Sequence, residues 1–178
     1  YFDTCSGIPD NMGGYQYART GKGMMALVIK GKEAEYREYL QVKLTQPMID
    51  AHSYCVEFYV NMANWSQLVS IPPQLYFHDS AFTNPITTVL NFLPQFVDTS
   101  FTVSDTVNWI KVSGTFNCLG NYQYMTIGNF FNDANTKIIN YAPSYFSAYY
   151  YIDDISITDC TPNAVTTINN ADRLHVYP

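Results

Sequence analysis

Residues 54–62 read YCVEFYVNM, and their pattern indicates the fold class. Val56, Phe58 and Val60 recur at every second position, with polar or aromatic residues between them. Successive residues of a β-strand point to opposite faces, so a period of two places these three side chains on one face. We therefore expect a strand whose apolar face lies in a core.

The same alternation occurs in the segments on either side. Leu40, Val42 and Leu44 share one face of residues 39–44, and residues 110–116 alternate in the same way. Further strands are expected at residues 25–29, 74–78, 122–130 and 149–157. Many strands separated by turn-forming residues, without a credible helix, predict an all-β, antiparallel two-sheet jelly-roll β-sandwich. We expect the apolar faces of residues 40–44 and 56–60 both to be buried.

The chain changes character at Cys160. Residues 1–160 form the predicted sandwich, in which residues 79–105 alternate poorly and are expected to be a long connection between the sheets. Residues 161–170 are polar and rich in Thr, Asn and Pro, which predicts a linker. Residues 171–178 (ADRLHVYP) then restart an alternating pattern. Membrane insertion is not expected, because no apolar run approaches the roughly 20 residues that span a bilayer.

Composition and charge exclude one class of partner. The chain has a net charge of −6 and no cluster of Lys or Arg, whereas nucleic-acid binding requires a basic surface. The four cysteines are widely spaced and form no C-x-x-C pair, so a zinc ribbon or thioredoxin-like site has no support. Four cysteines allow three pairings, and the sequence leaves both the pairing and its existence open.

Two stretches carry a resemblance to a known group of domains. Residues 150–157 (YYIDDISI) resemble the closing strand of calcium-containing jelly-roll carbohydrate-binding modules, in which a Y-I-D-D-V-x-L string recurs. Residues 19–27 are similar to the S-G-K-x-S-L strand of the same modules, and residues 35–42 and 54–60 resemble surface proteins of Bacteroidota. The resemblance implies a galactose-binding-like or carbohydrate-binding-module-like sandwich outside the cell. It does not imply an activity.

A structural calcium ion is part of what this resemblance implies. Asp153 has the parity of Ile155 and Ile157, which predicts an inward carboxylate, and such a group needs a cation or several hydrogen bonds. The other expected calcium ligands are Asp3 and the backbone carbonyls of Arg19, Lys22 and Gly23. The alternative is that Asp153 accepts backbone N–H bonds without a metal.

The end of the chain carries a second resemblance. Residues 174–178 (LHVYP) are similar to the opening of the type IX secretion sorting domain, φ-x-V-Y-P-N-P, and they follow the predicted linker. This implies export by the type IX secretion machinery to the cell surface or the medium. Ser80 and Thr106 each follow an Asp and precede an apolar residue, as in the O-glycosylation pattern of Bacteroidota. Ordinary turn chemistry accounts for the same tripeptides equally well.

Outward-facing aromatic residues are the candidate ligand-binding groups, because the C–H faces of sugars stack on aromatic rings. Trp65 is expected in a loop, and Tyr59, Trp109 and Tyr124 have outward parity, as does either Tyr149 or Tyr151. The alternative for each is structural packing, since aromatic pairs also stabilise sheets.

Catalysis is not expected from this sequence. His52, His78 and His175 are far apart, and no nucleophile, zinc-protease or phosphate-binding motif is present. The leading hypothesis is a non-catalytic extracellular module that binds a glycan or mediates surface adhesion. The alternative is a structural or assembly component of a cell-surface complex, in which the sandwich is a spacer or binds a protein partner.

Overall fold

The computed structural model describes residues 7–83, 87–140 and 147–162, which contain β-strands and no helix. The strands are β1 (Asp10–Asn11), β2 (Gly14–Tyr15), β3 (Met25–Lys30), β4 (Leu40–Lys43), β5 (Ser53–Met62), β6 (Leu68–Ser70), β7 (Gln74–His78), β8 (Ile110–Asn117), β9 (Tyr124–Gly128), β10 (Ile138–Asn140) and β11 (Ala148–Asp159). The described residues hold no helix that is long and apolar enough to cross a membrane.

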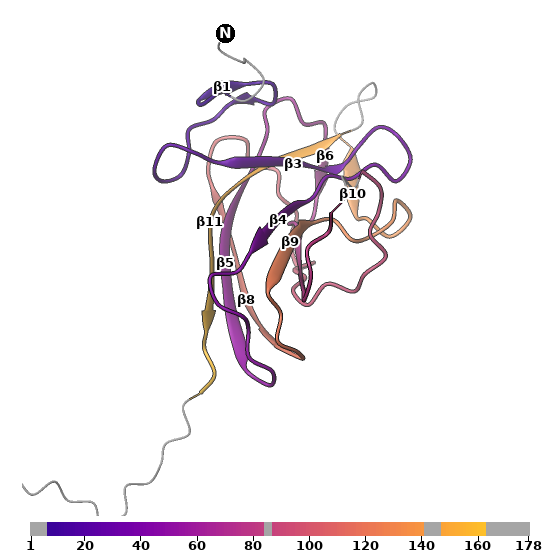
Figure 1. The fold of residues 1–178 in the computed structure, drawn as a ribbon. Helices are drawn as coiled ribbons and strands as arrows, with labels where there is room; N and C mark the ends of the chain where they lie inside the picture. Colours follow the sequence, from indigo (N-terminus) through magenta and orange to yellow (C-terminus); the bar gives the residue numbers. More distant parts are fainter. Residues whose placement is uncertain (1–6, 84–86, 141–146, 163–178) are drawn as a thin grey trace, which may run out of the picture.

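Two antiparallel sheets form the body of the molecule (Figure 1). One has the strand order β3-β11-β5-β8 and the other has the order β4-β9-β7, while β1-β2 and β6-β10 form small additional pairs. The core contains side chains of both sheets, among them Val56, Phe58 and Val60 of β5 and Leu75 and Phe77 of β7. These observations confirm the predicted all-β sandwich and the predicted buried face of β5.

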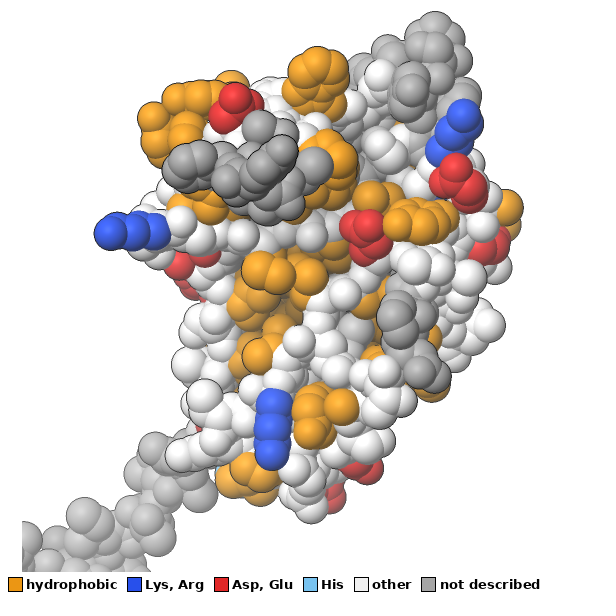
Figure 2. Space-filling model, turned by 45° about the horizontal axis from the view of Figure 1, so that its top comes forward, with side chains coloured by type: hydrophobic (Ala, Val, Ile, Leu, Met, Phe, Trp, Pro, Cys, Tyr) orange, Lys and Arg blue, Asp and Glu red, His pale blue; other side chains and the backbone are white. Residues whose placement is uncertain are grey.

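The edge strand β4 is less buried than predicted. Its register places Val42 opposite Met125, whose other neighbour is Phe77, so Val42 does face the inner side of its sheet. Val42 is nevertheless 50% exposed, because no strand of the described chain covers this edge. A groove of about 640 Å³ opens between β4 and the end of β11 there, and exposed hydrophobic side chains gather between β3 and β4 (Figure 2). The predicted burial of the 40–44 face is therefore wrong at its centre, and Leu40 and Leu44 are half-buried.

A β-bulge in β11 overturns the predicted inward position of Asp153. On β11 three steps separate Asp153 from Ser156, whereas their partners on β5, Tyr59 and Glu57, are two steps apart. The extra residue reverses the alternation, and Asp154 has a φ of 51°, in the left-handed region. Asp153 therefore lies on the outer face beside Tyr59.

The short strands and the long connection account for the rest of the fold. Residues 79–83 and 87–109 form no named strand but contribute isolated bridges, in which Phe96 pairs with Leu75 and Val103 with Ser70. The Cys55–Cys160 disulfide joins β5 to the residue after β11. Of the other cysteines, Cys118 is buried and Cys5 lies outside the described residues. The predicted linker from residue 163 onwards and the sorting-domain segment also lie outside them.

Candidate binding surface at one end of the sandwich

Three segments that are distant in sequence meet where β5 ends and β8 begins. They are the β1-β2 hairpin with residues 16–19, the loop at residues 63–67 and the loop at residues 104–109. Together they line an open groove of about 830 Å³, which we call the tryptophan groove because Trp65 and Trp109 both line it. The β1-β2 hairpin that forms one wall of this groove lies at the end of the sandwich where β1 is labelled in Figure 1.

Backbone contacts fix the hairpin against the loop that carries Trp65. The Asn64 side-chain oxygen accepts a hydrogen bond from the Tyr15 amide at 2.7 Å, and the Trp65 amide donates to the Gly13 carbonyl at 3.1 Å. Gly14 has a φ of 132° and approaches Asn64 so closely that a Cβ would collide with it. Glycine at this position therefore permits the contact that holds the groove wall.

The loop on the other side is organised by Asp105. Its carboxylate accepts hydrogen bonds from the amides of Val107 at 2.8 Å and Asn108 at 2.7 Å, and these bonds lower the pKa of Asp105, with the Asn108 amide contributing most. The buried Asn61 side chain donates to the carbonyls of Asp105 and Asn108. Trp109 then donates its indole N–H to the Tyr17 carbonyl at 3.3 Å, which joins this loop to the hairpin segment.

The groove presents aromatic surface to solvent. Trp65 is 75% exposed, Tyr17 is 62% exposed and Tyr15 is 57% exposed, while Trp109 is half-buried. The Tyr15 and Tyr17 rings pack edge to face with centroids 5.6 Å apart, and their hydroxyls are 3.1 Å apart. This hydrogen bond raises the pKa of Tyr15. Such an arrangement offers flat apolar rings next to hydroxyl and amide groups, which suits a ligand with alternating apolar and polar faces.

The structure brings together only part of the predicted aromatic set. Trp65 and Trp109 line one groove, as an aromatic binding face requires. Tyr59 lies nearby on the outer face of β5, but the Arg19 guanidinium covers its ring at 3.4 Å from the centroid. Tyr15 and Tyr17 were not predicted, although a Tyr-x-Tyr pair in a turn-rich segment was a signal that could have been used.

Tyr124 is separate from the tryptophan groove. It lies on β9 of the other sheet and stacks with His78, whose ring centroid is 5.7 Å away. His78 is buried and contacts the hydroxyl of Thr126 at 2.8 Å, and burial lowers its pKa. Tyr124 is therefore part of an aromatic stack on the second sheet, which also includes Tyr76, Phe82 and Phe92.

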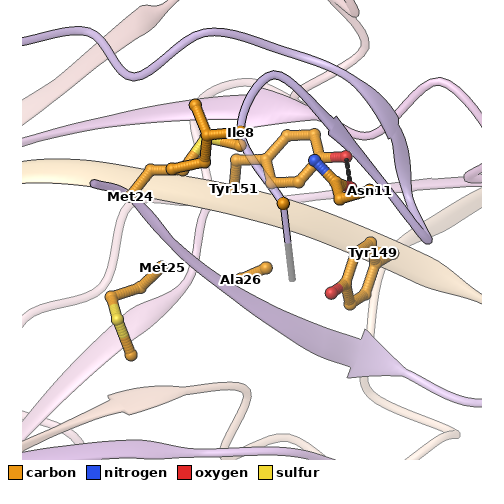
Figure 3. Close-up of a pocket in the computed structure, with 8 residues that line it drawn as sticks. Ile8, Asn11, Met24, Met25, Ala26, Tyr149 and Tyr151 are labelled. Carbon is orange, nitrogen blue, oxygen red and sulfur yellow. Dashed lines mark hydrogen bonds between the residues drawn. The ribbon is translucent and has the colours of Figure 1, made fainter. Parts of the chain in front are cut away.

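Tyr149 and Tyr151 border a smaller cavity of about 270 Å³ between the first residues of the described chain and strands β3 and β11 (Figure 3). Tyr151 is buried, and its hydroxyl donates to the Asn11 side chain at 2.5 Å. The cavity is otherwise lined mainly by apolar side chains, including Ile8 and Met24. Tyr151 thus serves packing, which is the alternative stated above for these aromatic residues.

The predicted calcium ligand Asp153 does meet the Arg19 loop, through amide donors. Its carboxylate accepts the Arg19 amide at 2.7 Å and the Asp154 amide at 2.8 Å. The neighbouring Asp154 binds the Arg19 guanidinium at 2.5 Å and the Thr20 hydroxyl at 2.5 Å, which lowers its pKa, the Thr20 bond contributing most. Within the described chain no group of three His, Cys, Asp or Glu side chains is placed to hold a metal ion. The hydrogen bonds of Asp153 are those that the metal-free alternative describes, whereas a calcium shell would need six to eight oxygen ligands.

Calcium at Asp153 remains a prediction that a melting curve checks. A structural ion joining the Arg19–Gly23 loop to β11 would stabilise only the folded state, so EDTA would lower the melting temperature by several degrees. We expect any such shift to disappear in Asp153→Asn. An unchanged melting temperature in EDTA and in excess Ca²⁺ would leave the amide bonds as the full account of Asp153.

The remaining predicted residues are dispersed. Lys22 and Gly23 are exposed in the loop before β3, Ser80 is exposed after β7, and Thr106 lines the tryptophan groove. Asp3 lies outside the described residues. His52 contacts Asp159 at 2.6 Å at the end of the sandwich opposite the groove, where the Thr161 and His52 hydrogen bonds lower the pKa of Asp159 to about 2.

Comparison with known proteins supports the fold. The chain resembles the solved structure of the CBM22-1 xylan-binding domain from Paenibacillus barcinonensis Xyn10C, with a TM-score of 0.50 and 18% sequence identity. The alignment covers 81% of this chain and 76% of that domain. No family model matches the sequence, and no curated protein matches it. The chain is thus a β-sandwich like that of a carbohydrate-binding module, and its function must be argued from its own residues.

Proposed function

We propose that this protein is a non-catalytic glycan-binding module and that the tryptophan groove is its binding site. The observation that carries the proposal is the convergence of Trp65, Trp109, Tyr15 and Tyr17 on one open groove. A large aromatic side chain that stays exposed to water gains little hydrophobic stabilisation on folding. Such side chains are also the ones that most often dominate binding energy. The likeness to a xylan-binding domain adds plant-type polysaccharides to the ligands worth testing.

The groove has a second property that suits a sugar. Its aromatic rings are accompanied by neutral polar side chains, Asn11, Gln16 and Asn64. Each donates one amide N–H to a backbone carbonyl, and the second N–H of each amide can donate to a ligand hydroxyl group. The hairpin and both loops are joined by hydrogen bonds, so the backbone that carries the rings and the Trp109 indole are held in place before a ligand arrives. Such preorganisation reduces the entropy lost on binding.

We also propose an extracellular location with export by a type IX secretion system. The Cys55–Cys160 disulfide supports the location, because disulfides persist in oxidising compartments. The LHVYP segment at residues 174–178 supports the export route through its resemblance to a sorting domain.

The alternative function, a protein-interaction module of a surface complex, has its own supporting surface. The groove between β4 and the end of β11 exposes Met25, Val42 and Ile155, and two strand edges flank it. Exposed apolar side chains next to free strand edges are suited to contact another protein. The groove on this side is separate from the tryptophan groove, so one set of variants distinguishes the two functions.

The glycan proposal is tested with Trp65→Ala and Trp109→Ala in affinity electrophoresis against a panel of soluble polysaccharides that includes xylan. Each variant is expected to weaken binding about 30-fold, because truncating a central aromatic residue costs about 2 kcal/mol. Leu119→Ala is the matched control, since Leu119 is 79% exposed at the opposite end of the sandwich. Binding that survives both tryptophan variants would place the site elsewhere. Failure of the wild type to bind any polysaccharide would favour the protein-interaction function.

A further inference from the structure

Trp65 borders two grooves. On one side lies the tryptophan groove, and on the other lies a groove of about 630 Å³, here called the second groove, whose wall includes Met12, Glu38, Gln67 and Tyr149. The exposed indole of Trp65 is therefore a ridge with an open depression on each side. Each groove alone has the volume of a small-molecule site, so a ligand that touches both must be longer than one groove holds.

The second groove contains a polar group without a protein partner. The side-chain carbonyl oxygen of Gln67 is buried and accepts no hydrogen bond from any residue that the structure describes. A buried acceptor left unpaired costs about 1–3 kcal/mol, and a rotation of the Gln67 side chain that turns this oxygen towards a ligand hydroxyl in the groove would recover that cost. Met12 and Tyr149 provide apolar surface beside it. The second groove thus combines the same two kinds of contact as the tryptophan groove.

The charged side chains that line the two grooves disfavour acidic ligands. Asp10 lines the tryptophan groove and Glu38 lines the second groove, so each of the two grooves contains a carboxylate. Among the described residues, the one cationic side chain lining either groove is Arg19, and it is ion-paired with Asp154 and packed over Tyr59. A polymer of uronic acids would meet two like charges with no unpaired cation from these residues to offset them.

We propose that an extended, uncharged polysaccharide chain crosses the Trp65 ridge and occupies both grooves. This inference rests on the proposed glycan-binding function and adds the length and the charge class of the ligand. Trp65 then contacts sugar units near the middle of the bound segment. The Gln67 side chain turns towards the second groove and accepts a hydroxyl hydrogen from a unit bound there.

Calorimetric titration with xylo- and cello-oligosaccharides, from dimer to hexamer, tests the proposal. In the series that binds, the hexamer is expected to bind at least about tenfold more tightly than the dimer. Met12→Ala and Gln67→Ala should each weaken hexamer binding about two- to tenfold and leave dimer binding unchanged, because the dimer fits within the tryptophan groove. Polygalacturonate should bind far more weakly than the neutral polymer.

The outcomes separate this inference from the function on which it rests. One outcome would rule out the second groove as part of the site and still leave the module a glycan binder. In that outcome Trp109→Ala abolishes binding, but affinity does not increase with oligosaccharide length and is unchanged in Met12→Ala and Gln67→Ala. Equal or stronger binding of polygalacturonate would overturn the charge argument. Absence of binding to every oligosaccharide and polymer would overturn both proposals. Neither variant is expected to unfold the domain. Met12 is exposed, and Gln67→Ala removes a side-chain oxygen that has no hydrogen-bond partner among the described residues.

Discussion

Asp133→Ala is expected to lower the free energy of unfolding by about 3 kcal/mol, because it leaves the guanidinium of Arg37 buried without a counter-ion. Arg37 has no exposed side-chain surface, and its Nη2 lies 2.8 Å from the Asp133 carboxylate. The same carboxylate accepts hydrogen bonds from Lys30 at 3.0 Å and from the Glu35 amide at 3.2 Å. One carboxylate therefore connects the end of β3 and the loop before β4 to the loop after β9.

The loss is not larger because Arg37 keeps other partners. Its guanidinium also donates to the carbonyls of Tyr36 and Phe131, both at 2.9 Å. Its Nε has no partner among the described residues, so the guanidinium already lacks one hydrogen bond before Asp133 is removed. Urea denaturation measures the change, and Glu33→Ala is the control because it removes an exposed carboxylate from the same loop. A shift no larger than that of the control would show that the charge of Asp133 is dispensable.

The pH dependence of this difference gives an independent check. Burial alone would raise the pKa of Asp133, but the Glu35 amide and the Arg37 and Lys30 cations outweigh it, and the pKa lies below its usual range. A carboxyl with a depressed folded-state pKa stabilises the protein above its unfolded pKa of about 4, and that stabilisation is lost as the pH falls towards the folded pKa. The difference between the wild type and Asp133→Ala should therefore be constant near neutral pH and shrink below about pH 4.

The sequence predicted the parts of the fold that repeat over several residues. The alternation of β5 and β8 identifies these strands and their buried faces, because a period of two that persists over five or more residues matches a strand and not the 3.6-residue period of a helix. The strands β1, β2, β6 and β10 have two or three residues each and carry no period. They form because distant segments pair with them, and contacts of that kind leave no local pattern.

The two errors of position have the same origin. Val42 has the parity of a core residue, but it lies on an edge strand, and parity does not reveal whether a neighbour covers an edge. The bulge at Asp153 reverses the alternation of β11 in the middle of a string that otherwise reads as regular. In the candidate site, the sequence identified Trp65 and Trp109 separately, but their meeting with Tyr15 and Tyr17 depends on hydrogen bonds between segments about 50 and 90 residues apart.

Removal of the Cys55–Cys160 disulfide is expected to destabilise the domain by about 4 kcal/mol. The bond spans 105 residues, and closure of a loop of about 100 residues restricts the unfolded chain by an amount worth nearly 5 kcal/mol in the chain-entropy model. For a protein of this size that corresponds to a decrease of roughly 10 °C in melting temperature. The prediction applies both to reduction and to Cys55→Ala/Cys160→Ala.

The position of the disulfide determines which part of the domain loses stability first when the disulfide is removed. Beyond the bulge, β11 pairs with β5 on one side, and its other edge has no strand partner in the described chain. The disulfide, the His52–Asp159 contact and the bond between the Ser53 amide and the Thr161 hydroxyl are the additional restraints at this end. Amides of residues 156–159 should therefore lose hydrogen-exchange protection before those of the core strand β8. The tryptophan groove lies at the opposite end of the sandwich, and we expect it to keep its ligand affinity at temperatures where the reduced domain is still folded.

A thermal-shift experiment with a reducing agent separates the disulfide from the other cysteines. The wild type and Cys118→Ala should both lose melting temperature on reduction, because Cys118 is a buried core residue whose thiol donates a hydrogen bond to the Gly120 carbonyl and forms no disulfide within the described chain. Cys55→Ala/Cys160→Ala should start at the lower temperature and respond no further. If this double variant still responded to the reductant, another disulfide would contribute to stability. If it melted at the wild-type temperature, the end of β11 would be held by its contacts with β5 alone, and the cross-link would add nothing to the folded domain.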